Sequence, residues 1–411
     1  MRSLLFAVAA ILVASASSAQ IPFDQALAEL TSPDEGTRLH AAQLLKEAAF
    51  EEAALPLVPL LADRRDDVQF EAIAAELNIF LADKLTPGKR KPGALAEPVF
   101  STGPLALGPR PVPVAVVNGL LAAARDDNPR VALEALYAFG TLAVGPGGAE
   151  RNTVLAASGP RLAAFLGSTD PATRYAAVRV MGRVFARRAS DPPIEPTVGD
   201  ALITALNDAD RLVKPAAMTA LGSMRYDRAV QALTELSHYY EKGPLAEASL
   251  DGLAHIANPA SVTVFSTLLG SKGDALKGIA VEGIARLGDP AKLPDIQAAL
   301  AGKYADATIL TGAFARGMLS NASLDPIAEA LAKPKLRDQA RGYLVELAPG
   351  RLALFSRYLQ DPDPKMRADV ADVLYLADDP VALSLLEPLL NDKDPDVVKA
   401  AERAVARLRQ H

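Results

Sequence analysis

Histidine side chains are the first groups in this sequence whose spacing could support metal or acid–base chemistry. The chain contains four of them, His40, His238, His255 and His411. None has the H-x-x-x-H spacing that places two imidazoles on one helix face, and no His-Glu dipeptide occurs. We therefore interpret His40 and His255 as structural or surface residues and predict no histidine metal site.

Acidic residues at alternate positions form the second candidate group. They are Asp361 and Asp363, followed by Asp392, Asp394 and Asp396. Alternating carboxylates could bind calcium, but these runs lack the glycine and the distal glutamate of an EF-hand loop. An aspartate before a proline is also a strong helix N-cap, because its carboxylate accepts from free N–H groups of the first turn. Capping is the simpler interpretation, so we predict no catalytic residue, no metal, no cofactor and no enzymatic activity.

The composition excludes further classes of function. Cysteine is absent from the 411 residues, which excludes thiol catalysis, thiolate metal sites and covalently attached haem. No G-x-S-x-G motif occurs, and Gly145–Gly148 does not follow a predicted strand, so neither a serine hydrolase nor a phosphate loop is indicated. The net charge of −6 argues against a nucleic-acid partner, because phosphate contacts need clustered Lys and Arg.

The first twenty residues, MRSLLFAVAAILVASASSAQ, have the pattern of a secretory signal peptide. Arg2 precedes an apolar run from Leu4 to Val13, and Ser17 and Ala19 fit a cleavage before Gln20. The run is shorter than the roughly 20 residues that span a bilayer, which disfavours a membrane anchor. We predict a signal peptide over 1–19, a periplasmic or secreted mature protein and no membrane insertion after cleavage.

A repeat organises the rest of the chain. The segment DPDPKMRADVADVL (361–374) is followed by the similar DPDVVKAAERAVARL (394–408). We use Pro364 and Pro395 as anchors, and equivalent positions can be traced back to Glu35, Asp67, Pro129, Pro171, Arg211, Pro244, Asp274, Asp306 and Pro334. From Arg211 onward the steps are 33, 30, 32, 28, 30 and 31 residues. This period is typical of stacked helical repeats.

Each repeat unit is predicted to contain two helices. In the unit that begins at Pro364, one helical face carries Met366, Val370, Val373 and Leu374. After a break at Asp378–Pro380, a second helix is expected to carry Leu385, Leu386, Leu389 and Leu390. A single helix pair cannot bury such a face, but stacked pairs cover one another.

The pattern D-P-x-x-R followed by an Ala-rich apolar helix, as in DPATRYAAVRVMG (170–182) and DPKMRADVADVL (363–374), resembles the HEAT-like repeat. It is most similar to the short bacterial variety that also occurs in phycobilin lyases. The resemblance implies an all-α fold, an armadillo-like α-solenoid of about ten or eleven repeats in a right-handed superhelix. The deoxyhypusine hydroxylases, a HEAT-like enzyme family, bind iron through His-Glu motifs, and those motifs are missing here.

Pro- and Gly-rich segments divide the repeats. We expect N-terminal repeats in 20–83, an insertion in 84–113 and the main solenoid in 114–411, with shorter interruptions at 145–150 and 187–197. The insertion is either a surface loop or a binding arm, in which the basic cluster Lys89–Lys91 would contact an acidic partner. The unbroken period after residue 200 predicts mainly nearest-neighbour contacts.

A column of cations follows the anchors by three residues. It contains Arg38, Arg174, Lys214, Lys277, Arg337 and Arg367. Asp170, Asp210 and Asp363 lie four residues before Arg174, Lys214 and Arg367, which predicts i,i+4 ion pairs. The HEAT resemblance suggests a ladder of ion pairs between repeats. The alternative is a basic groove for an anionic ligand.

Function is indicated only at a general level. We predict an exported scaffold that binds a protein or peptide through its curved surface, where the helices that begin at the anchors line the concave side. Two alternatives stay open. One is a lyase-type protein that holds a chromophore, and the other is a structural module of an envelope assembly.

Overall fold

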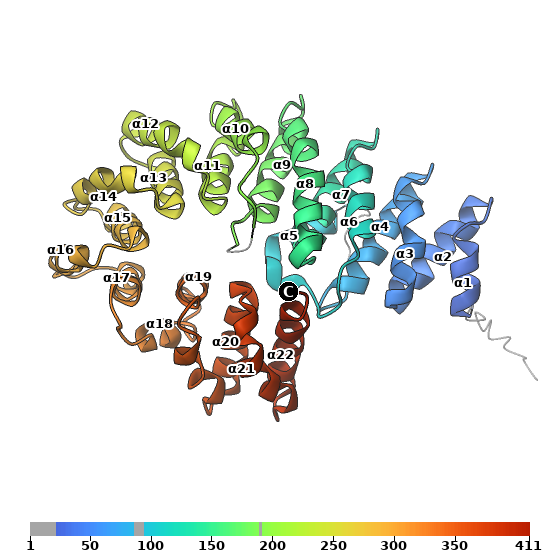
Figure 1. The fold of residues 1–411 in the computed structure, drawn as a ribbon. Coiled ribbons are helices and arrows are strands. Elements are labelled where there is room, and N and C mark those ends of the chain that lie inside the picture. Colours follow the sequence, from blue (N-terminus) through green and yellow to red (C-terminus); the bar gives the residue numbers. More distant parts are fainter. Residues whose placement is uncertain (1–21, 86–93, 189–190) are drawn as a thin grey trace, which may run out of the picture.

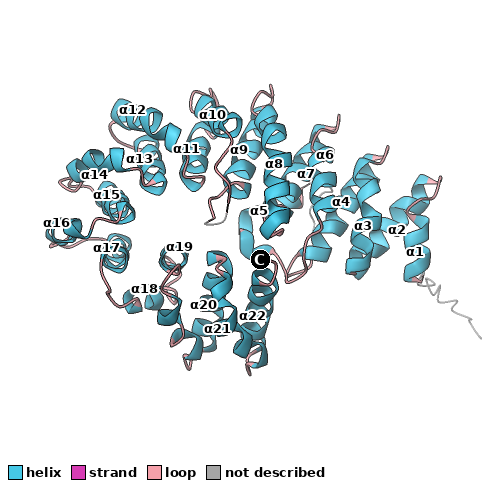
Figure 2. Cartoon of the chain, in the orientation of Figure 1, coloured by secondary structure: helices cyan, strands magenta, loops and turns pink. Residues whose placement is uncertain are grey.

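The computed structural model describes residues 22–85, 94–188 and 191–411, and it is built from helices (Figure 2). In this part of the chain the β-type pairing consists of one isolated bridge between Leu81 and Leu107. The all-α solenoid that the sequence predicted is therefore confirmed. The proposed signal peptide over 1–19 lies outside the described residues.

We call the helices that begin at the anchors the anchor helices. Within the described ranges they are α2 (Glu35–Ala48), α4 (Asp66–Phe80), α7 (Pro129–Leu142), α9 (Pro171–Val184), α11 (Val213–Ser223), α13 (Pro244–Ile256), α15 (Asp274–Leu287), α17 (Asp306–Leu319), α19 (Arg337–Leu347), α20 (Pro364–Ala377) and α22 (Pro395–Leu408). Each anchor found in the sequence thus lies at or within three residues of a helix start.

A second set, the leading helices, each precede an anchor helix in the chain. They are α1 (Phe23–Glu29), α3 (Ala54–Leu57), α6 (Val114–Ala123), α8 (Gly148–Phe165), α10 (Pro196–Ala205), α12 (Val230–Tyr240), α14 (Val262–Leu268), α16 (Leu293–Ala299), α18 (Asp325–Ala330) and α21 (Leu383–Leu386). The leading segment before α20 consists of the 3₁₀ helices η7 (Leu352–Phe355) and η8 (Tyr358–Gln360). Several leading helices are short because prolines interrupt them.

The segment between α20 and α22 illustrates this interruption. The expected second helix is divided into α21 and the 3₁₀ helix η10 (Glu387–Asn391), with Pro388 at the join. A proline inside a helix has no N–H for the i−4 carbonyl, so the α-helical ladder stops there. Of the four leucines predicted for its apolar face, Leu386 and Leu389 are buried, whereas the other two are half-buried.

The D-P starts of the anchor helices are caps, as predicted. The carboxylate of Asp170 accepts from the N–H groups of Ala172 and Thr173, and the carboxylate of Asp394 accepts from two N–H groups of its own first turn. Asp363 does the same for Lys365 at 2.9 Å. These bonds satisfy donors that have no partner inside the helix.

The core runs along the whole superhelix between the two sets of helices. Its fully buried large side chains include Phe80, Phe139, Phe265, Phe314 and Phe355. Small residues bring neighbouring anchor helices close together: a methyl group on Gly222 of α11 would lie 3.0 Å from the Cα of Gly252 on α13. This close stacking buries the alanine-rich faces of the repeats.

The chain has the shape of a ring with a stem (Figure 1). Helices α1 to α4 project to one side, and the units from α6 onward curve round until α20 and α22 return to the middle of the chain, beside α5 (Ala96–Thr102). The predicted nearest-neighbour stacking is present along the ring. The last two units have further contacts with the N-terminal half of the chain, which nearest-neighbour stacking does not include.

The insertion 84–113 differs from the expected surface loop, since its described part is packed. Helix α5 lies against α7, its Phe100 is 2% exposed, and the carboxylate of Glu134 accepts from the N–H groups of Leu95 and Ala96 at 2.9 Å each. Pro98 is tolerated because it lies in the first turn, where no i−4 carbonyl needs its N–H. The basic cluster Lys89–Lys91 lies outside the described residues.

Candidate functional site

The inner side of the ring is formed by anchor helices, as the concave-side hypothesis expected. Figure 1 shows α11, α13, α15, α17 and α19 on this side, with the leading helices of the same units outside. The curvature lets side chains two units apart touch: Arg286 on α15 pairs with Glu346 on α19 at 2.8 Å. The inner side is therefore one continuous surface.

The ring is closed first by contacts between the C-terminal helices and the insertion. The hydroxyl of Tyr375 on α20 donates to the carbonyl of Pro104 at 3.3 Å, and Arg403 on α22 donates to the carbonyl of Leu105 at 3.1 Å. These partners are 271 and 298 residues apart in the chain. The insertion thus supplies carbonyl acceptors to the far end of the solenoid.

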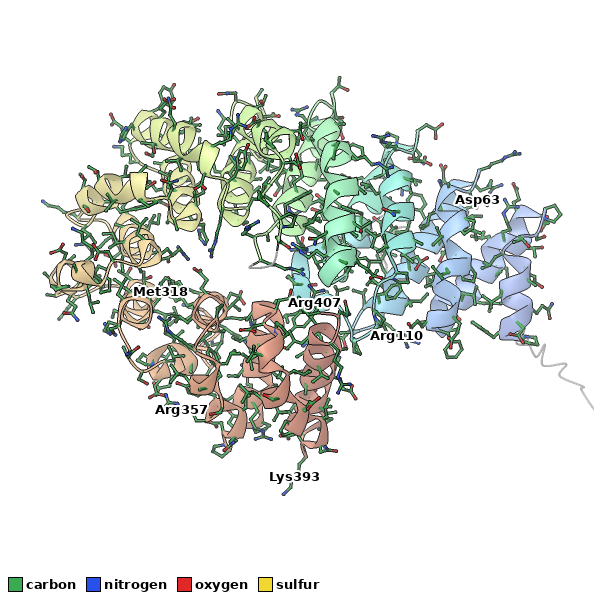
Figure 3. The ribbon with its side chains drawn as sticks, in the orientation of Figure 1. Asp63, Arg110, Met318, Arg357, Lys393 and Arg407 are labelled. Atoms are coloured by element: carbon green, nitrogen blue, oxygen red, sulfur yellow. The ribbon has the colours of Figure 1, made fainter. Side chains whose placement is uncertain are left out.

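Arg407 on α22 makes the most extensive closing contact (Figure 3). Its guanidinium donates to the carbonyls of Val144 at 2.9 Å, of Pro146 at 3.3 Å and of Gly145. It also pairs with Asp378 at 2.8 Å, and its side chain is 6% exposed. Arg407 therefore joins the last helix to the 145–150 interruption.

A junction cavity of about 290 Å³ lies where these segments meet. Four arginines line it, Arg183 from α9, Arg187 and Arg188 after α9, and Arg407 from α22. The carboxylate in its lining is that of Asp378, which pairs with Arg188 at 3.0 Å and with Arg407. Both ends of the ring therefore build the cavity, and its lining is strongly basic.

Burial, together with neighbouring cations, lowers the pKa of two arginines in the junction cavity. Burial, with a contribution from the neighbouring Arg179, lowers the pKa of Arg183 to about 10. Burial and the charge of Arg151 lower the pKa of Arg188 to about 10. Both side chains remain charged at neutral pH, but the charged form is less favourable here than in water.

A second cavity of about 360 Å³ lies next to the junction cavity and shares Arg183 with it. It is lined by α5, α9 and α11, and its polar groups include Arg179, Thr219 and Ser223. Arg179 is held by Glu97 at 3.0 Å and by the hydroxyl of Ser101 at 2.9 Å. The two cavities form a hollowed strip across the inner side of the ring.

The histidines that the sequence singled out do not converge. His40 and His238 are exposed, and the ring of His255 contacts the carbonyl of Asp251 on its own helix at 3.0 Å. His411 lies 3.0 Å from Asp378. Across the described residues no cluster of three or more histidine or acidic side chains could hold a metal ion, and no helix is long and apolar enough to cross a membrane.

The cation column forms a ladder between repeats, as the resemblance suggested. Arg174 pairs with Asp208 at 2.7 Å and Arg367 pairs with Asp392 at 2.7 Å, each in the loop before the next anchor helix. The pair between Arg38 and Asp63 repeats this arrangement near the N-terminus. The hydrogen bonds from the arginines hold the pKa of Asp208 and of Asp392 below its ordinary value.

The predicted i,i+4 ion pairs are wrong. Asp170 and Asp363 bind N–H groups of their own first turn, so their carboxylates are engaged as caps. Arg174 and Arg367 point to the following unit instead, and Lys214 contacts the hydroxyl of Tyr240 at 3.2 Å. The cations of this column are therefore structural and do not form the basic groove.

The arginines that line the junction cavity were not identified as site residues in the sequence analysis. Three arginines lie close together in the sequence at the end of α9 and the start of the 187–197 interruption: Arg183, Arg187 and Arg188. This local density of cations could have indicated a basic site. Arg407 carried no such signal, because its role depends on Val144, 263 residues away.

Comparison with known families supports the repeat assignment. A family model described as HEAT repeats matches residues 159–248 and 324–406. These segments run from within α8 into α13 and from α18 into α22. A comparison with curated protein sequences gives no match.

Solved structures with related folds are distant. An engineered protein is 20% identical with a TM-score of 0.44, covering 94% of this chain and 98% of its own. The complex of CpcE and CpcF of phycocyanin lyase from Nostoc sp. PCC7120 is 20% identical with a TM-score of 0.41, covering 60% and 94%. A designed armadillo repeat protein is 18% identical with a TM-score of 0.38, covering 65% and 100%.

These similarities concern architecture and carry no information on a ligand or an activity. The chain consists of stacked helix pairs with capped D-P starts and inter-repeat Arg–Asp pairs, and two of its segments match the HEAT repeat model. It is a HEAT-like repeat protein.

Proposed function

We propose that this protein is an exported scaffold that binds a protein or peptide partner on the inner side of its ring. The observation that carries the proposal is the continuous surface formed by successive anchor helices. Repeat stacking uses the apolar faces of these helices, while the remaining side chains differ between units. Tyr175 and Asp338, for example, each lie four residues after an anchor, and neither is buried.

The size of this surface supports a protein partner. A stable interface buries about 800 Å² on each side, which three or four adjacent repeat units can supply. The second cavity, on α5, α9 and α11, combines Phe100 and aliphatic groups with Arg179 and Arg183. Aromatic and arginine side chains are the residues enriched at protein interfaces.

Site-specific photo-crosslinking in the native host tests this proposal. A photoreactive residue at Thr219, which is exposed in the lining of the second cavity, should capture a discrete partner. The matched control is Thr204, which is exposed on the leading helix α10. Equal capture from both positions, or none from Thr219, would contradict binding on the inner side.

Export is part of the proposal and has its own test. Support comes from the pattern of residues 1–19, with a cation, an apolar run and small residues before Gln20. Mass analysis of the protein from a secreting host should find a mature N-terminus at Gln20. Retention of Met1 in the exported protein would show that these residues are not a cleaved signal.

A further inference from the structure

We propose that the junction cavity binds a compact oxyanion with two or more negative charges, such as a phosphate compound or a small polycarboxylate. The proposal goes beyond the binding of a protein partner and does not depend on it. The cavity has a volume of about 290 Å³, which is large enough for a small molecule rather than a folded segment. Its arginines come from two parts of the chain that meet at the ring closure.

The first argument is the charge of the lining. Arg183, Arg187, Arg188 and Arg407 face the single carboxylate of Asp378, so four positive charges and one negative charge leave an excess of three. Asp378 is already shared between Arg188 and Arg407. Such an excess is unusual in a chain whose net charge is −6.

The second argument is that two of these cations lack a carboxylate. In the described part of the chain no ion pair is formed by Arg183 or Arg187, and the residues outside that part, 1–21, 86–93 and 189–190, contain no Asp or Glu. The buried Arg151 and Arg286, by contrast, each have a carboxylate within 2.8 Å. Arg183 is partly buried, and a partly buried cation without a counter-charge is costly, so a bound anion would offset that cost.

The third argument is the preorganisation of Arg183. Its guanidinium carbon lies 3.7 Å from the centroid of the Phe100 ring, and one N–H donates to the carbonyl of Phe100. The side chain is therefore fixed, while its other guanidinium nitrogens have no hydrogen-bond partner among the described residues. A fixed planar fork with free donors matches the geometry of phosphate and carboxylate oxygens.

Arg187 complements Arg183 at the rim of the cavity. It is exposed, and one of its guanidinium nitrogens donates to the carbonyl of Pro192 at 2.5 Å, which leaves further donors for a ligand. The lowered pKa values of Arg183 and Arg188 agree with this picture. Burial is the main cause of both shifts, and a bound anion would favour the charged form of each guanidinium.

Anion binding would also be linked to ring closure. Arg183 and Arg187 belong to the N-terminal half, whereas Arg407 belongs to the last helix, so the complete site exists only in the closed ring. A ligand that binds the closed form alone must stabilise that form. Bound pyrophosphate should therefore slow amide hydrogen exchange in α22, and unchanged exchange at saturation would overturn this link.

Titration calorimetry with inorganic phosphate, pyrophosphate and citrate at constant ionic strength tests the site. We expect at least one probe to bind, and Arg183→Gln and Arg187→Gln each to weaken its affinity about tenfold or more, the loss of a charge-assisted hydrogen bond. The matched control is Arg161→Gln, which removes an exposed arginine from α8 and should leave the affinity unchanged. Because Arg187 is exposed, its variant retains the fold even where Arg183→Gln does not.

Three results would overturn the proposal. The first is no binding of any of the three anions to the folded protein. The second is an equal loss of affinity in Arg161→Gln, which would show a general charge effect. The third is binding of a hexaglutamate peptide but of none of the small anions, which would assign the junction cavity to an acidic peptide instead.

Discussion

Replacement of Arg407 by alanine should open the ring without unfolding the repeats. The variant loses two hydrogen bonds to Asp378, at 2.8 and 3.1 Å, and leaves the carbonyls of Val144 and its two neighbours without their donor. Removal of one partner from a buried ion pair costs about 3–5 kcal/mol. Asp378 keeps Arg188 at 3.0 Å, so we take the lower limit, about 3 kcal/mol.

A cost of about 3 kcal/mol shifts the equilibrium between closed and open rings by roughly 100-fold. The absence of native cysteine allows spin labels to be placed cleanly, for example at the exposed Thr102 on α5 and the exposed Glu402 on α22. Wild-type protein should give one narrow distance distribution by pulsed electron spin resonance. Arg407→Ala should give a broad, longer distribution while helical circular dichroism at 25 °C is retained.

The matched control is Arg409→Ala, at the residue that directly follows α22. Arg409 is 58% exposed and pairs with Glu387 at 3.1 Å, and exposed pairs contribute at most about 1 kcal/mol. Its label distances should match those of the wild type. If Arg407→Ala and Arg409→Ala give the same distances, the buried contacts of Arg407 do not close the ring and the reasoning fails.

Three further predictions concern single positions elsewhere in the molecule. Gly283→Ala should lower the free energy of unfolding in urea by about 1–3 kcal/mol, because its methyl group would lie 2.6 Å from the buried Phe265 ring. The control Gly342→Ala has nothing within 4 Å of the new methyl group and should raise that free energy by about 0.5–1 kcal/mol. Equal effects of the two substitutions would contradict the packing described. Glu76 is fully buried without a hydrogen-bond partner, and burial raises its pKa well above the ordinary 4.5, so the folded state binds its proton more tightly and stability should fall as pH rises above about 4.5. Glu76→Leu should remove this slope and be more stable at pH 7.5, and an unchanged pH profile would refute the assignment. Asp338→Lys should leave the melting temperature within about 1 °C of wild type, because its side chain is 95% exposed, but should weaken capture of the inner-side partner; a large drop in melting temperature would show a structural role.

The repeat architecture could be predicted because its signals are local. A proline at a helix start and an aspartate before it act within one turn, so Pro364 and Pro395 located helices α20 and α22 correctly. The ion pairs of the cation column were assigned wrongly because sequence spacing does not give the direction of a side chain. Arg174 turns away from Asp170 toward Asp208, whose position depends on how one unit stacks on the next.

Ring closure could not be predicted from the same signals. The curvature of a solenoid is the sum of small rotations between neighbouring units, so it cannot be predicted from the sequence of a single repeat. The three interruptions were visible in the sequence, but the sequence did not indicate that all three lie beside the C-terminal helices. Pro104, Gly145 and Arg188 each come from a different interruption, and all three contact α20, α22 or the Asp378 that follows α20.

Closure also constrains how the number of repeats can change. An open solenoid tolerates the gain or loss of a unit, because each unit contacts only its neighbours. In this protein, duplication or deletion of one unit between α9 and α20 would carry Arg407 away from the carbonyls near Val144 and separate Asp378 from Arg188. The copy number of the ring is therefore fixed by geometry, and the length of the chain is expected to vary in the stem, where α1 to α4 lie outside the closed circuit.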